Sequence, residues 1–218
     1  MKILVYAPHN DDEVLGLGGT IAKLTDAGHE VYVCEVTSGN CKERVELIKG
    51  EAGKAHSILG VKETFFLDLP VVELKNHSAL EMNKKILEVT KKVSPDIAFI
   101  PHKGDMHRDH YEVALAAMVA LRPVELPNLK AIYAYETLSE TEWNIPSADN
   151  LFVPNVWVDI TNYIDKKIEA MECYESQIQE FPKPRSVDAI RALASYRGST
   201  ICVEKAEAFM LIRQNELC

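Results

Sequence analysis

Two short segments of this chain are rich in the side chains that bind metal ions and transfer protons. PHNDDE (8–13) follows an apolar run and places His9 three residues before Asp12. In a turn, that imidazole and that carboxylate can both reach one cation, which leaves Asp11 beside the ion without binding it. HKGDMHRDH (102–110) follows another apolar run and contains three histidines and two aspartates.

Each segment also has a simpler, structural explanation. Acidic residues such as Asp11 and Glu13 suit the positive N-terminus of a helix, and Asp109 is of a residue type that is common at helix N-caps. The distribution of histidine favours chemistry instead. The chain has 7 histidines, and four of them lie in these two segments: His9, His102, His107 and His110.

Short apolar or β-branched runs alternate with longer helical patterns along the chain. The runs predict strands at 2–7, 31–37, 64–68, 96–101, 131–136 and 155–160, and the helical patterns fill 16–27, 42–59, 77–93, 108–121, 161–180, 185–196 and 203–213. Such alternation is typical of βαβ units. We therefore predict one α/β domain over residues 1–218, with a Rossmann-like, doubly wound, mostly parallel sheet, helices on both faces and a helical C-terminal portion.

The predicted topology brings the two histidine-containing segments together. In a doubly wound sheet of order 3-2-1-4-5, the first and fourth strands are neighbours, and ligands bind in the crevice outside their carboxyl ends. PHNDDE follows the first strand and HKGDMHRDH follows the fourth. Two imidazoles and one carboxylate leave one coordination position open, which is typical of a catalytic zinc site and not of a structural one. The sequence predicts one such zinc ion per chain.

Glycines follow the first segment, in GLGG (16–19). The dinucleotide-binding pattern G-x-G-x-x-G needs a third glycine that is missing here, and it begins directly after the strand. Carboxylates in the same turn would also repel a pyrophosphate. We interpret Gly16, Gly18 and Gly19 as positions of close packing, and a non-enzymatic Rossmann-type nucleotide-binding module remains an alternative function.

These residues make the chain similar to the LmbE-like, or PIG-L, family of zinc-dependent N-acetylglucosaminyl deacetylases, which includes enzymes of the mycothiol and bacillithiol pathways. The family motif A-H-P-D-D-E resembles PHNDDE, and the motif H-x-D-H is matched by HRDH (107–110). Further similarity extends over most of the chain, at GLGGTIAKL (16–24), TSGN (37–40), LGV (59–61), SQ (176–177) and KAEAFM (205–210).

The resemblance implies a role for each residue of the two motifs. Zinc would be held by three ligands: His9, Asp12 and His110. Asp11 would be the general base that takes a proton from water and passes it to the leaving amine. His107 would stabilise the developing oxyanion, with Asp109 orienting its imidazole and favouring the protonated form. Glu13 is expected to support the loop.

The implied reaction is hydrolysis of the acetamide of an N-acetylated small molecule, one that contains N-acetylglucosamine, by metal-activated water. A metal-dependent hydrolase of another bond, such as a phosphoester, is an alternative. Two-metal phosphoesterases need more bridging carboxylates than this sequence places near the site.

Two positions depart from the family pattern and concern the substrate. Asn10 stands where the family usually has proline, and Ile48 stands where an arginine, three residues before Glu51, helps to hold the substrate. Arg44 lies one turn earlier and is a candidate replacement. Two arginines of the C-terminal part are further candidates for binding an anionic or sugar group: Arg191 and Arg197.

The bulk composition limits the partners that we expect. A formal net charge of −9 argues against binding to nucleic acid or to an anionic membrane surface. No apolar run approaches the ~20 residues of a membrane span. The five cysteines include no C-x-x-C pair, so we expect a reduced, cytoplasmic protein. The family resemblance allows a homo-oligomer, either a trimer or a hexamer.

Overall fold

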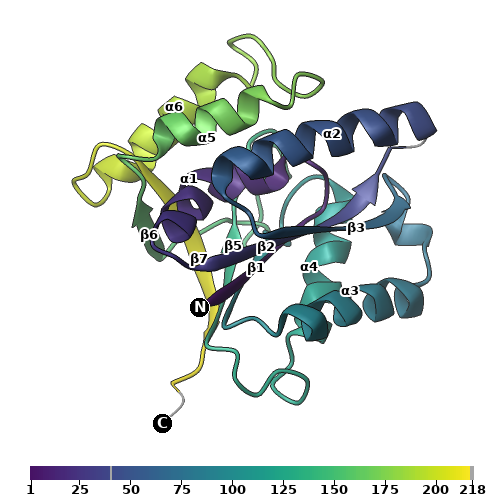
Figure 1. Cartoon of the computed structure of the whole chain (residues 1–218). Helices are drawn as coiled ribbons and strands as arrows, with labels where there is room; N and C mark the ends of the chain where they lie inside the picture. Colours follow the sequence, from purple (N-terminus) through teal and green to yellow (C-terminus); the bar gives the residue numbers. More distant parts are fainter. Residues whose placement is uncertain (40, 217–218) are drawn as a thin grey trace.

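A seven-stranded sheet runs through the centre of the molecule (Figure 1). The computed structural model describes residues 1–39 and 41–216; Asn40, which ends the TSGN turn, and Cys218 lie outside the described residues. The strand order is β3-β2-β1-β4-β5-β7-β6. The first five strands along the chain pair with one another in parallel: β1 (Lys2–Ala7), β2 (Glu30–Ser38), β3 (Glu63–Pro70), β4 (Ile97–Pro101) and β5 (Ala131–Tyr135). The predicted doubly wound α/β fold is confirmed.

Helices cover both faces of the sheet (Figure 1). One apolar core lies between the sheet and the three helices α1 (Asp12–Asp26), α2 (Lys42–Leu59) and α5 (Ile164–Glu172). A second core lies on the opposite face, under α3 (Ala79–Val93), α4 (Arg108–Ala120) and the short helix η1 (Leu74–Asn76). Across the described residues, no helix is both long enough and apolar enough to cross a membrane.

The C-terminal part differs from the prediction. The helix expected at 203–213 is a strand, β7 (Ala206–Gln214), which pairs antiparallel with β5 on one side and with β6 (Val156–Asp159) on the other. The helix expected at 161–180 ends much earlier, because α5 stops at Glu172 and a turn follows. The helix expected at 185–196 is present as α6 (Val187–Ser199).

The glycines of GLGG pack as expected. A Cβ on Gly16 would lie 2.3 Å from the ring of Tyr135 in β5, and a Cβ on Gly19 would lie 2.7 Å from Ile160. The backbone N–H groups of Gly19 and Thr20 donate to the carboxylate of Glu207, at 3.0 and 2.6 Å. These two amide groups, in the interior of α1, are therefore paired with a carboxylate of the chain itself.

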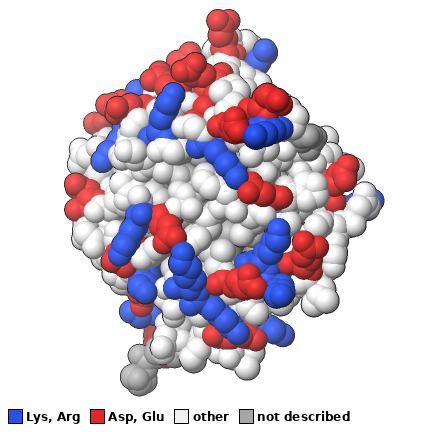
Figure 2. Space-filling model, turned by 45° about the vertical axis from the view of Figure 1, so that its right-hand side comes forward, with Lys and Arg blue, Asp and Glu red and all other residues white. Residues whose placement is uncertain are grey.

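Charged side chains are mixed on the face of the molecule that Figure 2 shows, where acidic and basic groups alternate instead of gathering into one basic field. This distribution agrees with the net charge of −9. It offers no extended positive surface on that face for a polyanion to bind.

Candidate metal and catalytic site

The site begins where β1 and β4 end side by side. These strands pair in parallel, with Ile3 opposite Ile97 and Val5 opposite Phe99. The segments that leave their carboxyl ends therefore meet at the same edge of the sheet. This arrangement brings His9 and Asp12 against His110, although they are about a hundred residues apart in sequence.

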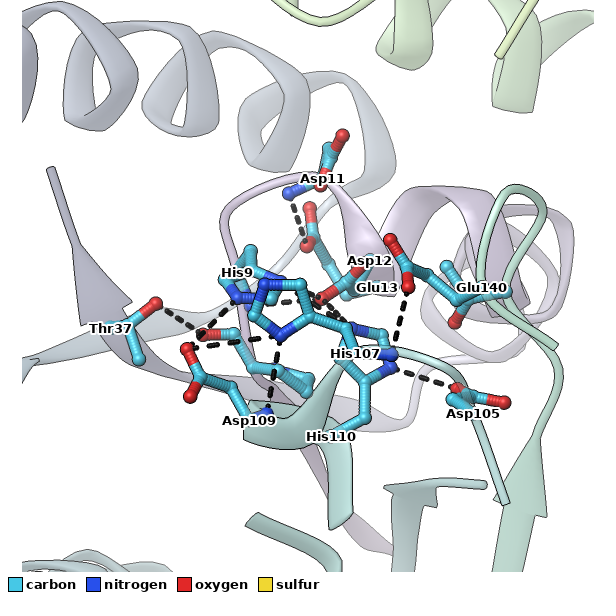
Figure 3. A network of polar contacts seen from close by, with 12 residues as sticks. His9, Asp11, Asp12, Glu13, Thr37, Asp105, His107, Asp109, His110 and Glu140 are labelled. Carbon is cyan, nitrogen blue, oxygen red and sulfur yellow. Dashed lines mark hydrogen bonds and ion pairs between the residues drawn. The ribbon is translucent and has the colours of Figure 1, made fainter. Parts of the chain in front are cut away.

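Three side chains form a compact set of metal donors. Nδ1 of His9 lies 3.2 Å from Oδ2 of Asp12, Nε2 of His110 lies 3.1 Å from the same oxygen, and the two nitrogens are 3.4 Å apart. The other oxygen of Asp12, Oδ1, is buried and has no hydrogen-bond partner. Two imidazoles and a carboxylate in a triangle of this size fit one divalent cation. Figure 3 shows the three residues close together: His9 from the turn after β1, Asp12 from α1 and His110 from α4.

A second carboxylate stands behind each of these imidazoles. Oδ2 of Asp105 lies 2.8 Å from Nδ1 of His110, and the hydroxyl of Thr141 donates to the other oxygen of Asp105 at 2.6 Å. Oδ2 of Asp109 lies 3.4 Å from Nε2 of His9. Carboxylates in this position fix the orientation of a metal-binding imidazole.

His9 and Asp109 also form a different possible triangle with His107. Asp109 is less available as a ligand, because its carboxylate already accepts hydrogen bonds from the backbone N–H groups of Val72 and Leu74, at 2.7 and 3.3 Å. Asp12 has an oxygen to spare, so the set with His110 is the better metal site.

The charged groups of the donor triangle strongly shift one another's pKa values. Burial opposes the charged form of His9, but its contacts with Asp109 and Asp12 outweigh burial and raise its pKa to about 9. Burial also disfavours the charge on Asp12, and the neighbouring His110 and His9 nevertheless hold its pKa well below the usual range. The pocket is thus built to hold positive charge against Asp12, whether as protons or as a cation.

Asp11 has a distinct environment from Asp12. It is 1% exposed, and its backbone has a φ of 148°, a strained conformation for a residue with a side chain. Its carboxylate accepts from Nη1 of Arg185 at 2.7 Å. Burial raises the pKa of Asp11 to about 7, and the Arg185 charge acts against that rise. A carboxyl group with a pKa near neutrality is suited to exchange protons with water.

His107 differs from the expectation. Burial, and then the adjacent His9, lower its pKa to about 4, so its imidazole is neutral instead of protonated. The Asp109 carboxylate is 3.9 Å from Nδ1 of His107, too far for a hydrogen bond. The backbone N–H of Asp109 donates to that nitrogen instead, at 3.2 Å. Because Nδ1 accepts, the proton of the neutral ring is on Nε2, which can donate a hydrogen bond to an oxyanion.

The three candidate arginines have different surroundings. Arg44 lines a cavity of about 80 Å³ together with His9, Asp11 and Ile48. Arg191 forms an ion pair with Asp165 at 2.6 Å and does not line that cavity. Arg197 binds both carboxylate oxygens of Glu136, at 2.8 and 2.6 Å, and lines a separate cavity. Of these three arginines, Arg44 is therefore the one that lines a cavity with residues of the first motif.

Sequence reasoning missed Arg185 and the orienting role of Asp105. Arg185 lies in a proline-rich loop far along the chain, and it also donates to the hydroxyl of Ser139 at 2.9 Å. An arginine in such a loop carries no local signal. Asp105 was within the second segment, and its position five residues before His110 was the available clue.

Comparisons with known proteins agree with this geometry. The family model described as GlcNAc-PI de-N-acetylase (PIG-L) matches residues 4–121. The diacetylchitobiose deacetylase of Thermococcus kodakarensis is 30% identical over an alignment of 211 residues, which covers 90% of this chain and 78% of that protein.

Two solved structures are similar over nearly the whole chain. A conserved protein of Thermus thermophilus superposes with a TM-score of 0.80 and 28% identity, covering 99% of this chain and 96% of the other. The N,N'-diacetylchitobiose deacetylase of Pyrococcus horikoshii gives a TM-score of 0.77 and 26% identity, covering 97% and 83%.

Proposed function

We propose that the substrate of this protein is a small molecule containing N-acetylglucosamine, because the chain belongs to the PIG-L family of GlcNAc-PI de-N-acetylases. The protein is a deacetylase, a hydrolase of amide C–N bonds. The observation that carries the proposal for its site is the donor triangle of His9, Asp12 and His110, with sides of 3.1 to 3.4 Å.

The metal that we propose for this triangle is a single Zn²⁺. Two imidazoles and one carboxylate are a donor set that zinc favours, and the buried Oδ1 of Asp12 has no partner within the chain. When bound, zinc would lower the pKa of a water molecule toward ~7 and polarise the amide carbonyl. His110 and His9 would be held for this purpose by Asp105 and Asp109.

Asp11 is the proposed general base. It lies next to Asp12 in sequence without belonging to the donor triangle. Its Oδ2 is fixed by Arg185, and the strained backbone at Asp11 keeps the carboxylate in one place. We propose that Asp11 takes the proton from the attacking water and delivers it to the nitrogen of the departing sugar amine.

His107 is the proposed hydrogen-bond donor to the oxyanion. Its neutral ring would donate through Nε2, while the Asp109 N–H holds Nδ1. A neutral donor in a fixed position stabilises negative charge that appears only as the carbonyl is attacked. This role replaces the protonated imidazole that the family resemblance implied.

The sugar is proposed to lie over the small cavity beside His9. Its lining includes three polar side chains that can bind hydroxyl or anionic groups: Ser38, Arg44 and Gln177. Ile48 lines the same cavity, so Arg44 can reach the space that an arginine at position 48 would serve. The proposed ligand is an N-acetylated sugar or sugar conjugate, and a homotrimer or homohexamer is the assembly that we expect.

Neither alternative from the sequence is favoured. A phosphoester hydrolase would not explain the similarity to deacetylases. A nucleotide-binding module would bring phosphates against the carboxylates of Asp11, Asp12 and Glu13 in the turn after β1, which would repel them.

Two matched variants test the proposed roles. Asp11→Ala is expected to keep its zinc and to lose at least 100-fold in turnover, about the contribution of a general base. His110→Ala is expected to lose the zinc of this site together with activity. Acetate release is measured with N-acetylglucosamine, its conjugates and chitooligosaccharides, and zinc content is measured on the same preparations. Full activity in Asp11→Ala would exclude the proposed base.

A further inference from the structure

Glu35 is a carboxylate in the middle of a buried strand. All residues of β2 after Glu30 are buried, and Glu35 itself is 0% exposed. Neither of its carboxylate oxygens has a hydrogen-bond partner. A carboxylate is rarely left buried without a partner, because removing its charge from water costs several kcal/mol. A bound cation or a proton would relieve this cost.

Two further ligand-type side chains face this carboxylate. Glu13 comes from the first turn of α1 and His56 from α2, and one donor atom from each of the three residues lies within 4.8 Å of the others. Nε2 of His56 is 3.1 Å from Glu13 and 3.5 Å from Glu35. In the described part of the chain, no lysine or arginine forms an ion pair with Glu13 or Glu35. We call these three residues the buried acid–imidazole cluster.

The outer contacts of the buried acid–imidazole cluster resemble those around a bound metal. The hydroxyl of Tyr174 donates to Oε1 of Glu13 at 2.6 Å. Nδ1 of His56 lies 2.7 Å from the hydroxyl oxygen of Thr64. When Nδ1 carries the ring proton and donates it to Thr64, the lone pair of Nε2 faces the two carboxylates. A cation between them would make that arrangement favourable.

We propose that the buried acid–imidazole cluster is a second, structural site for one divalent transition-metal ion such as Zn²⁺. The two oxygens of Glu35, one oxygen of Glu13 and Nε2 of His56 are four donor atoms, the number that zinc usually takes. One imidazole and two carboxylates also suit this class of ion. A single shared proton would pair one oxygen of Glu35 and leave the other without a partner.

Such an ion would connect three elements. Glu13 belongs to α1, Glu35 to β2 and His56 to α2. Glu13 directly follows Asp12 and accepts from the backbone N–H of Asp11 at 3.2 Å. The ion would therefore anchor the segment that carries Asp11 and Asp12 to the sheet, without itself taking part in the reaction.

Metal content tests the proposal on the full chain. Because the buried acid–imidazole cluster has no exposed ligand, the ion enters as the chain folds. The protein is therefore produced in zinc-supplemented medium and purified by gel filtration without chelator. We expect two zinc ions per chain in the wild type, one in His110→Ala, one in Glu35→Gln and none in the double variant. One zinc in the wild type that His110→Ala removes would overturn the second site and leave the proposed function intact.

A stability measurement covers the case in which variants fold poorly. Glu35→Gln keeps the size of the side chain and removes its charge. In the His110→Ala background, it is expected to lower the melting temperature, because the remaining ion is lost. If Glu35 instead held only a proton, the neutral amide would leave the melting temperature unchanged or raise it, and the proposal would fail. His56→Gln provides an independent variant with the same expected loss of one zinc ion.

Discussion

Arg185 controls the charge on Asp11 more directly than any other residue of the described chain. Its guanidinium is 2.7 Å from the Asp11 carboxylate, which is otherwise buried next to Asp12 and Glu13. Burial raises the pKa of Asp11 to about 7, and the positive charge of Arg185 opposes that rise. Removing the charge should therefore raise the pKa of Asp11 further.

This argument predicts a shifted pH profile for Arg185→Ala. A base works only when it is deprotonated, so a higher pKa moves the acidic limb of kcat/KM toward higher pH, by about one unit or more. Arg185→Lys keeps a positive charge and should shift the limb less. The measurement is kcat/KM for acetate release between pH 5 and 9, and an unchanged limb in Arg185→Ala would argue against Asp11 as the base.

The residues of the site were predictable to different degrees. His9, Asp12 and His110 could be predicted because histidine is rare in the chain and both segments directly follow strands. Arg185 could not, since it reaches Asp11 across 174 residues of sequence. The neutral state of His107 depends on burial and on the adjacent His9, and neither is visible in a linear motif.

At the scale of the elements, α1 approaches β5 so closely that only glycine fits at one position. Gly16→Ala would place a methyl group 2.3 Å from the ring of Tyr135. We predict a loss of about 1–3 kcal/mol in the free energy of unfolding, as is typical of overpacked cores. Gly50→Ala is the matched control, because Gly50 lies in α2 with no other atom within 4 Å of its added Cβ.

The control should change stability in the opposite direction. Alanine in an exposed helical position is more stable than glycine by about 0.5–1 kcal/mol. Urea denaturation of the two variants and the wild type measures both effects. Equal stabilities for Gly16→Ala and Gly50→Ala would show that Tyr135 can move away from the added methyl group without a loss in the free energy of unfolding.

An ion pair fixes α5 and β7 to the kink of α1. Nζ of Lys167 donates to Glu207 at 2.6 Å and to the carbonyl of Leu15 at 2.8 Å, and both charged residues are 4% exposed. Lys167→Met would leave Glu207 buried without its cation, which should cost about 3–5 kcal/mol. Lys167→Met/Glu207→Gln should recover part of that loss. A double variant as unstable as Lys167→Met would contradict the explanation that the unpaired charge of Glu207 causes the loss of stability.

The composition of β7 explains why this strand was mistaken for a helix. The segment AEAFMLIRQ is rich in residues with high helix propensity, such as alanine, glutamate, methionine and leucine. Its position between β5 and β6 overrides that propensity, because the sheet buries Ala206, Ala208 and Phe209. The five parallel strands were easier to predict, since their runs are apolar along most of their length.

At the scale of the whole molecule, the doubly wound sheet offers one ligand crevice at the junction of β1 and β4. In nucleotide-binding members of this fold class, the helix after the first strand receives the phosphates through its backbone amides. Here α1 begins with two acidic residues, Asp12 and Glu13, and the buried Asp11 precedes them. The crevice is therefore equipped for a cation and closed to a pyrophosphate.

This difference predicts how the molecule responds to ligands in calorimetry. Metal-depleted protein should bind Zn²⁺ with a saturable heat, because Asp12 and the two imidazoles converge without a positive side chain between them. NAD and ATP at millimolar concentration should give no saturable heat, since Asp11, Asp12 and Glu13 would repel their phosphates. His110→Ala is the control for zinc and should weaken its binding. Micromolar binding of either nucleotide would contradict this repulsion and would show that the fold retains a function besides deacetylation.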